Sequence, residues 1–234
     1  MSRLVLLAVA AATMVSGLLL SNEVLAEHRW NGYHWPGTGT RTLHLENQAG
    51  AEYQVDDVVD DWNGLNAPVQ LVVDGGSNVV VRSKNMNAWY LGLAEIRVDT
   101  SGHILEGRVT LNDRYLKEGN LYGYDWADRK AVLCQEVGHI LGLDHVHDQT
   151  DTCMNDQLAL TGENEQVSPS QLAGTTPNAH DGQELNAIYS HDDGGGDGGS
   201  GGNGGPPCSK NPDHPRCTGD GVWITIHVIP VPGR

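Results

Sequence analysis

Residues 134–145 of the chain read Cys-Gln-Glu-Val-Gly-His-Ile-Leu-Gly-Leu-Asp-His. In an α-helix of about 3.6 residues per turn, positions four apart lie on one face, so Gln135 and His139 can reach the same metal ion. Glu136 is rotated by about 100° from Gln135 and would lie beside that ion. Gly142 falls where we expect the helix to end, because glycine accepts the left-handed conformation of a helix C-terminus. The chain can then turn back and bring His145 to the metal.

This pattern resembles the zinc-binding helix His-Glu-x-x-His-x-x-Gly-x-x-His of the metzincin clan, and most closely that of the matrixins, with Gln135 in place of the first histidine. Met154, in the segment Asp-Thr-Cys-Met-Asn-Asp of residues 151–156, matches the methionine that metzincins place under the metal. Residues 30–35 and 109–113 are similar to segments of secreted bacterial matrixin-like proteins, a group in which a Cys-Gln-Glu helix also occurs. The resemblance covers roughly residues 30–191.

The resemblance implies a secreted zinc endopeptidase. His139 and His145 would bind Zn²⁺, and Glu136 would take a proton from the metal-bound water and pass it to the leaving amine. We expect the side-chain oxygen of Gln135 to be the third protein ligand; His147 and a solvent molecule are the alternatives. An amide oxygen binds zinc less well than imidazole does, so weaker metal affinity is expected than in a three-histidine site.

Other readings of the motif stay open. The chain can be a catalytically inactive zincin fold that binds peptides or proteins, or a metal-dependent hydrolase of a non-peptide substrate. An ordinary amphipathic helix with two incidental histidines is the plainest alternative. Glu136 favours the enzyme, because an inactive site has no chemical need for a general base beside two metal ligands.

Composition divides the chain of 234 residues into four parts. Residues 1–26 have the positive start, apolar centre and small-residue cleavage site of a signal peptide. Residues 27–191 form the matrixin-like domain, residues 192–207 a Gly-rich linker, and residues 208–234 a small tail. No later segment is long and apolar enough to cross a bilayer. We therefore expect a secreted protein, extracellular or periplasmic, that is monomeric and has no membrane span.

The four cysteines suit an oxidising compartment. Cys208 and Cys217 can close a short loop in the tail. If the metzincin resemblance holds, Cys134 and Cys153 lie on either side of the metal, and a disulfide between them would tie the helix to the methionine segment. Two unpaired buried thiols, or one cysteine as a zinc ligand, are the alternatives.

The net charge of −16 argues against nucleic-acid binding and against binding to anionic membranes. Asp144, Asp148 and Asp151 crowd one loop, and matrixins commonly carry structural Ca²⁺. Their spacing does not match a calcium loop, so solvated acidic side chains are the preferred interpretation.

Hydrophobic periodicity predicts an α+β fold. The metzincin resemblance implies a mostly parallel mixed sheet, with a metal-binding helix and a methionine turn, and two subdomains around a cleft. A helix is expected over residues 51–65 and another ending near Leu141. A last helix should begin at Asp181, with Glu184 completing a capping box, and His180 and His191 beside it are expected to be surface residues. Strands are expected at residues 40–45, 69–73, 78–82, 94–98, 105–111 and 223–231. By resemblance, one edge strand would pair with an extended substrate.

Overall fold

The computed structural model describes residues 28–119, 122, 124–147, 151–156, 173–193, 217–218 and 221–230. Its centre is one seven-stranded sheet in the order β2-β1-β3-β5-β4-β7-β6. The strands are β1 (Arg41–Gln48), β2 (Val69–Val73), β3 (Val79–Lys84), β4 (Tyr90–Val98), β5 (Ile104–Asn112), β6 (Cys217–Thr218) and β7 (Gly221–Pro230). Strands β1, β2, β3 and β5 are parallel, whereas β4 runs antiparallel to both β5 and β7. The predicted α+β class and mixed sheet are confirmed.

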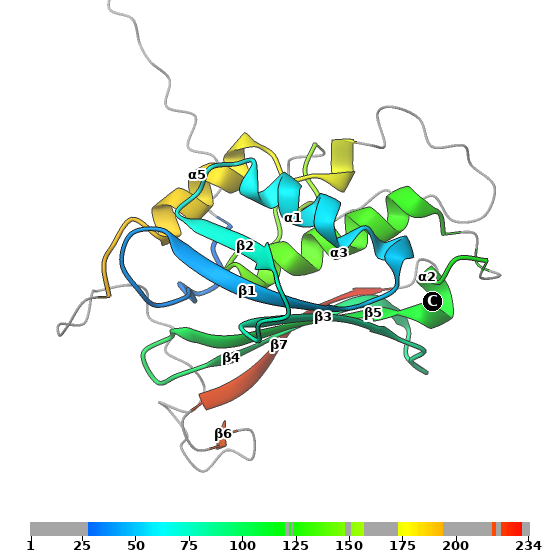
Figure 1. The fold of residues 1–234 in the computed structure, drawn as a ribbon, viewed down its shortest axis with the longest axis horizontal. Helices are drawn as coiled ribbons and strands as arrows, with labels where there is room; N and C mark the ends of the chain where they lie inside the picture. The colour runs from blue at the N-terminus through cyan, green and yellow to red at the C-terminus, as the bar shows by residue number, and fades with distance from the viewer. Residues whose placement is uncertain are drawn as a thin grey trace, which may run out of the picture.

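The helices are α1 (Val55–Asn63), α2 (Asp113–Leu116), α3 (Trp126–Ile140) and α5 (Ala179–Ile188), with short 3-10 turns η1 (Ala51–Tyr53) and η2 (Ala173–Thr175). Helices α1, α3 and α5 lie on the same side of the sheet (Figure 1). None of the helices in the described part of the chain is long and apolar enough to cross a membrane.

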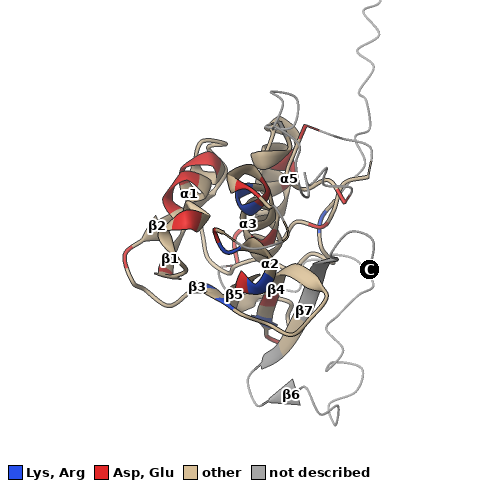
Figure 2. Ribbon diagram, turned by 90° about the vertical axis from the view of Figure 1, so that its right-hand side faces the viewer, with Lys and Arg blue, Asp and Glu red and all other residues tan. Residues whose placement is uncertain are grey.

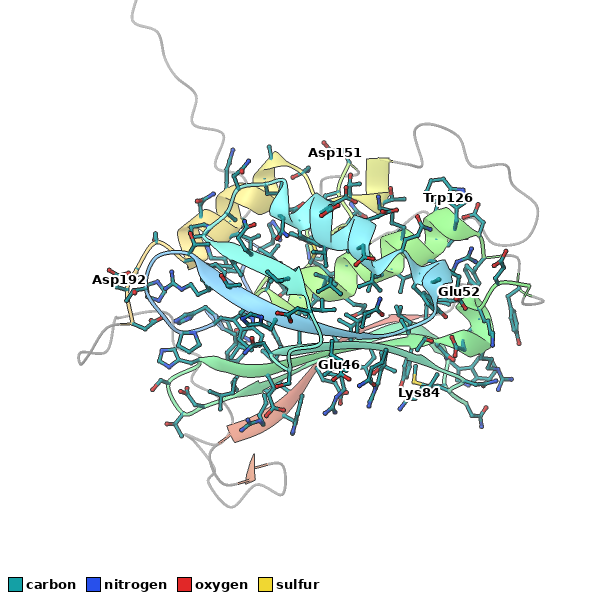
Figure 3. The ribbon with its side chains drawn as sticks, in the orientation of Figure 1. Glu46, Glu52, Lys84, Trp126, Asp151 and Asp192 are labelled. Carbon is teal, nitrogen blue, oxygen red and sulfur yellow. A yellow bond between two sulfur atoms is a disulfide. The ribbon has the colours of Figure 1, made fainter. Side chains whose placement is uncertain are left out.

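Alternation along β1 and helical spacing along α1 explain how the core forms. Every second residue of β1 from Arg41 to Leu45 is buried, as a strand with one covered face requires. Helix α1 buries Val55, Val58, Val59 and Trp62, and its aspartates lie on the outer face (Figure 2). Helix α3 is buried along almost its whole length. Trp126, which begins α3, is the exception at 45% exposure (Figure 3).

Two predicted helices need correction. The helix expected over residues 51–65 is broken at Gln54, whose φ of 53° is left-handed, so η1 and α1 are separate. The last helix begins at Ala179 rather than Asp181: the side chain of Asn178 caps it, and Asp181 is the third helical residue of that capping box. His180, expected at the surface, is buried at 5% exposure.

The C-terminal tail belongs to the same sheet, because β7 pairs along β4. Trp223 of β7 lies over the guanidinium of Arg108, 4.4 Å from ring centroid to Cζ, and Ile224 packs against the core. The predicted strand at residues 223–231 is thus present and docks on the domain. The segment predicted to be a signal peptide (residues 1–26), residues 194–207 of the predicted linker, and Cys208, the predicted partner of Cys217, lie outside the described residues.

Candidate metal centre

The N-terminus of α3 is fixed by a capping box. The carboxylate of Asp125 accepts hydrogen bonds from the N–H groups of Ala127 and Asp128, and the Asp128 carboxylate accepts one from the Asp125 N–H. These bonds satisfy N–H groups that a helix start leaves without partners.

At its other end, α3 closes in a Schellman motif around Gly142. The Gly142 N–H donates to the His139 carbonyl and the Leu143 N–H to the Gly138 carbonyl. Gly142 has φ 101°, and a Cβ there would lie 2.4 Å from the Tyr33 carbonyl oxygen. Conformation and space both require glycine, and the predicted helix end is confirmed.

The turn brings His145 back to His139. Their Nε2 atoms are 3.2 Å apart, and the rings meet at 66°. Two nitrogens bound to one tetrahedral zinc would be about 3.3 Å apart, given Zn–N bonds of about 2.0–2.1 Å. The Nδ1 of His139 lies 3.0 Å from the Leu143 carbonyl oxygen. A carbonyl can only accept, so a neutral His139 carries its proton on Nδ1 and presents the Nε2 lone pair.

Gln135 lies one helical turn before His139 and is buried at 2% exposure. Its Nε2 donates two hydrogen bonds of 2.8 Å, to the carbonyl oxygens of Cys153 and Asn155. Both acceptors belong to residues 151–156, the methionine turn. The amide nitrogen of Gln135 therefore fastens α3 to this turn.

The methionine turn is held to α3 in two further ways. Cys134 and Cys153 form a disulfide, as predicted, with Cα atoms 5.9 Å apart. Met154 is fully buried below the helix, and its sulfur occupies the space where a Cβ on Gly138 would lie, 2.3 Å away. The methionine turn is thus tightly packed against α3 at Gly138.

Glu136 is fully buried, and both of its carboxylate oxygens are without a hydrogen-bond partner within the described part of the chain. One of these oxygens is 2.5 Å from where a Cβ on Gly92 of β4 would lie, so the carboxylate reaches the backbone of β4. Burial raises the pKa of Glu136 well above its ordinary value, although the nearby backbone N–H of Ala94 in β4 favours the charged form. A carboxylate this deeply buried, with no hydrogen bond of good geometry, is stabilised by a proton, a water or a cation beside it.

His147, the alternative third ligand, is placed differently. Its side chain is 76% exposed, and its Nδ1 lies 2.7 Å from a carboxylate oxygen of Asp156. Among the residues that the structure describes, no further His, Cys, Asp or Glu offers a ligand atom within 4.8 Å of both His139 and His145. Of the acidic loop, Asp144 accepts from the His145 N–H and Asp151 from Asn178, whereas Asp148 lies outside the described residues.

The sequence did not reveal Asp181 as a support of the site. Its Oδ2 accepts a 2.5 Å hydrogen bond from the Thr152 hydroxyl, and Thr152 in turn accepts from the Met154 N–H. Asp181 also lies 3.3 Å from His28 Nε2. Burial raises the pKa of Asp181, against the hydrogen bonds it accepts. The pattern Asn178-x-x-Asp181 is a capping-box signal that could have located this helix start.

A pocket of about 400 Å³ lies elsewhere, lined by residues that include Trp35, Arg41, Asn78 and Ile104. It contains none of the predicted site residues.

No protein-family model and no curated protein matches the chain. Among solved structures, high choriolytic enzyme 1, a hatching enzyme zinc-protease from the medaka fish Oryzias latipes, gives a TM-score of 0.41 at 12% identity, covering 68% of this chain and 96% of its own. Myroilysin gives a TM-score of 0.43 at 13% identity, covering 70% of this chain and 98% of its own. At identities and TM-scores this low, neither similarity is evidence for an activity. The functional assignment rests on the side-chain geometry.

Proposed function

We propose that the chain is a secreted zinc-dependent endopeptidase. The observation that carries this proposal is the approach of His145 to His139 of α3, with Nε2 atoms 3.2 Å apart, at the end of the helix that also holds the buried carboxylate of Glu136. Two imidazole nitrogens at this distance suit one shared cation.

The residues have distinct roles in the proposed reaction. His139 and His145 would hold the zinc, which would polarise the scissile carbonyl and acidify a water molecule. Glu136 would accept a proton as general base and deliver it to the leaving amine. Met154 and the Cys134–Cys153 disulfide act on structure alone, by holding the floor of the site.

For Gln135 we propose the third ligand position, through its side-chain oxygen. The two hydrogen bonds from Nε2 fix the amide plane and identify the oxygen as the remaining atom of the amide that can bind a metal. A neutral oxygen ligand would hold zinc less tightly than a histidine would.

Secretion is part of the proposal. The disulfide between two buried cysteines fits an oxidising compartment. The apolar start of the sequence supports export. The acidic composition suits a substrate that is a protein or peptide rather than a nucleic acid.

The alternative is a catalytically inactive zincin fold that binds a peptide or a protein. The observation in its favour is that Gln135 has a structural task, since both of its N–H groups are bonded to the methionine turn. A glutamine retained for this reason alone would leave only two metal ligands.

The Glu136→Gln variant separates the two functions. It keeps the shape of the side chain and the zinc ligands but cannot accept a proton, so we expect zinc content to stay unchanged and cleavage of a labelled unfolded protein to fall by about 10²–10⁴-fold. The exposed Glu118→Gln is the matched control and should cleave at the wild-type rate. Equal cleavage by wild type and Glu136→Gln, or no cleavage by zinc-loaded wild type, would support the binding module instead.

A further inference from the structure

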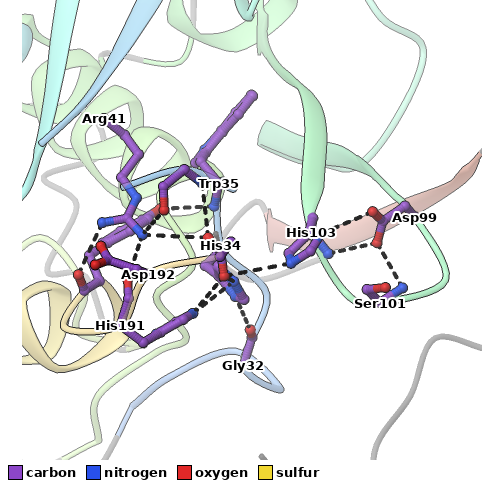
Figure 4. A network of polar contacts seen from close by, with 12 residues as sticks. Gly32, His34, Trp35, Arg41, Asp99, Ser101, His103, His191 and Asp192 are labelled. Carbon is purple, nitrogen blue, oxygen red and sulfur yellow. Dashed lines mark hydrogen bonds and ion pairs between the residues drawn. The ribbon is translucent and has the colours of Figure 1, made fainter. Parts of the chain in front are cut away.

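A second group of histidines lies outside the candidate metal centre. His34 precedes β1, His103 lies in the turn between β4 and β5, and His191 and Asp193 follow α5. Figure 4 shows His34, His103 and His191 converging from these three segments. We call these four residues the His₃Asp cluster.

Its ligand atoms lie at the distances of a metal site. The Nε2 atoms of His34 and His191 are 3.0 Å apart, and they lie 3.2 and 3.1 Å from Asp193 Oδ1. His103 Nε2 is 3.7 Å from the same oxygen. Neighbouring ligands of a tetrahedral zinc would be about 3.3 Å apart.

The outer nitrogens show which way the lone pairs point. His34 Nδ1 lies 2.8 Å from the Gly32 carbonyl oxygen, and His103 Nδ1 lies 3.1 Å from the Asp99 carboxylate. Both partners accept, so each neutral ring carries its proton on Nδ1 and turns an Nε2 lone pair inward. Metal-binding histidines are held in this way by carbonyls and carboxylates behind them.

Asp193 is also fixed by a partner on its outer side, so that its other carboxylate oxygen faces the cluster. Its Oδ2 accepts from the Gly37 N–H at 2.9 Å and faces the Arg41 guanidinium at 3.4 Å, which leaves Oδ1 directed at the histidines. The centre thus gathers two imidazole lone pairs and a carboxylate oxygen, whose mutual repulsion is relieved by a cation among them or by an Nε2–H of His191, which lies 3.0 Å from His34 and 3.1 Å from Asp193. Asp193 is 9% exposed and His34 is 12% exposed, whereas His103 is 26% and His191 48% exposed, so the cluster is open to water on the side of His191.

We propose that the His₃Asp cluster binds a second zinc ion with a structural role. The ligand atoms of His34, His103 and Asp193 lie within 4.8 Å of one another. His191, next to His34 and Asp193, would complete a set of four protein ligands, which is the arrangement of structural rather than catalytic zinc sites. The ion would join the segment before β1, the β4–β5 turn and the segment after α5, which are distant in sequence. Its role is independent of the proposed peptidase activity.

The experiment uses protein purified without a histidine tag and carrying His139→Ala, so that the candidate metal centre is disabled. After loading with zinc and gel filtration, we expect about one equivalent of zinc to remain, since three of the four ligands are held by fixed outer partners. Adding His103→Ala and His191→Ala should remove that zinc. His44→Ala is the matched control: His44 also pairs with a carboxylate, Asp74 at 2.7 Å, and its loss should leave the zinc content unchanged.

Two further readouts exclude a mere folding defect. Cobalt(II) bound to the His139→Ala protein should give the intense visible absorption of a four-coordinate ion, and the His103→Ala/His191→Ala protein should lack it. Zinc in excess should raise the midpoint of thermal unfolding by several degrees in the former and not in the latter, with both circular dichroism spectra native. Zinc-free His139→Ala protein, or zinc retained after loss of both histidines, would overturn the proposal.

Discussion

The sequence motif predicts that Gln135 is a metal ligand, whereas the structure shows that its side chain forms hydrogen bonds to the methionine turn. The motif places it where a metal ligand belongs, and the amide has two ends. The nitrogen end donates to the Cys153 and Asn155 carbonyls, which are part of the methionine turn. The spacing of residues along a helix shows on which face of α3 Gln135 lies. It does not show whether the amide nitrogen or the amide oxygen points toward the metal.

Replacing Gln135 should therefore affect stability as well as metal affinity. Gln135→Ala removes both donors from two backbone carbonyls of the methionine turn, so we expect a loss of about 1–3 kcal/mol in the free energy of unfolding, measured by urea titration with chelator present. Gln48→Ala, on the exposed face of β1, should change it by less than about 0.5 kcal/mol.

The same position tests the proposed ligand. Gln135→His offers imidazole in place of the amide oxygen, so zinc affinity should rise, whereas Gln135→Ala should lower it by about 10–100-fold. Competition with a chromogenic chelator measures both. Equal affinities for all three proteins would show that the Gln135 oxygen does not bind the metal.

At the scale of elements, periodicity identified most of the architecture. Strand β2 is found over residues 69–73 as predicted, and the end of α3 follows from Gly142. The break at Gln54 was missed because a non-glycine residue with positive φ leaves no sequence signal. The start of α5 was shifted because Asn178 and Asp181 can both cap a helix, and only the tertiary partner of Asp181, Thr152, decides between them.

For Gly138→Ala in α3, packing and helix propensity predict opposite changes in the free energy of unfolding. Gly138→Ala should stabilise an isolated helix, but the new Cβ would lie 2.3 Å from the Met154 sulfur and 2.8 Å from the Trp62 ring. Both neighbours are buried, so we expect a loss of about 1–3 kcal/mol in the free energy of unfolding, seen as a lower thermal midpoint.

Gly182→Ala in α5 is the matched control for this substitution. Its Cβ would meet Leu65 at 3.4 Å and beyond, which is ordinary contact, so we expect a gain of up to about 1 kcal/mol from propensity. Opposite signs for the two glycines indicate that packing between α3 and the methionine turn is tight. A Gly138→Ala protein as stable as wild type would show that Met154 can move.

At the scale of the whole molecule, the C-terminal tail changes what the sheet can bind. In the sequence, the tail appeared as a separate piece beyond a Gly-rich linker, and no local pattern could show which strand it would join. In the structure, β7 lies antiparallel along β4, with Leu93 opposite Val228 and Glu95 opposite Thr225. Gly92 of the same β4 lies against the carboxylate of Glu136. The strand beside the proposed general base is therefore already paired on both edges.

Under the proposed function, an extended substrate would need the edge of β4 that β7 covers. Removing residues 208–234, which include β6 and β7, should raise the rate of cleavage of a labelled unfolded protein by at least about tenfold, because a tethered segment competes at a high effective concentration. A synthetic peptide of residues 221–230 added to the truncated protein should lower the rate again, whereas a peptide of scrambled order should not. The truncated chain must first show native circular dichroism, since Ile224 packs against the core. A folded truncated protein that cleaves no faster than the full chain, and that the peptide leaves unaffected, would show that β7 is a structural strand and that substrate binds elsewhere.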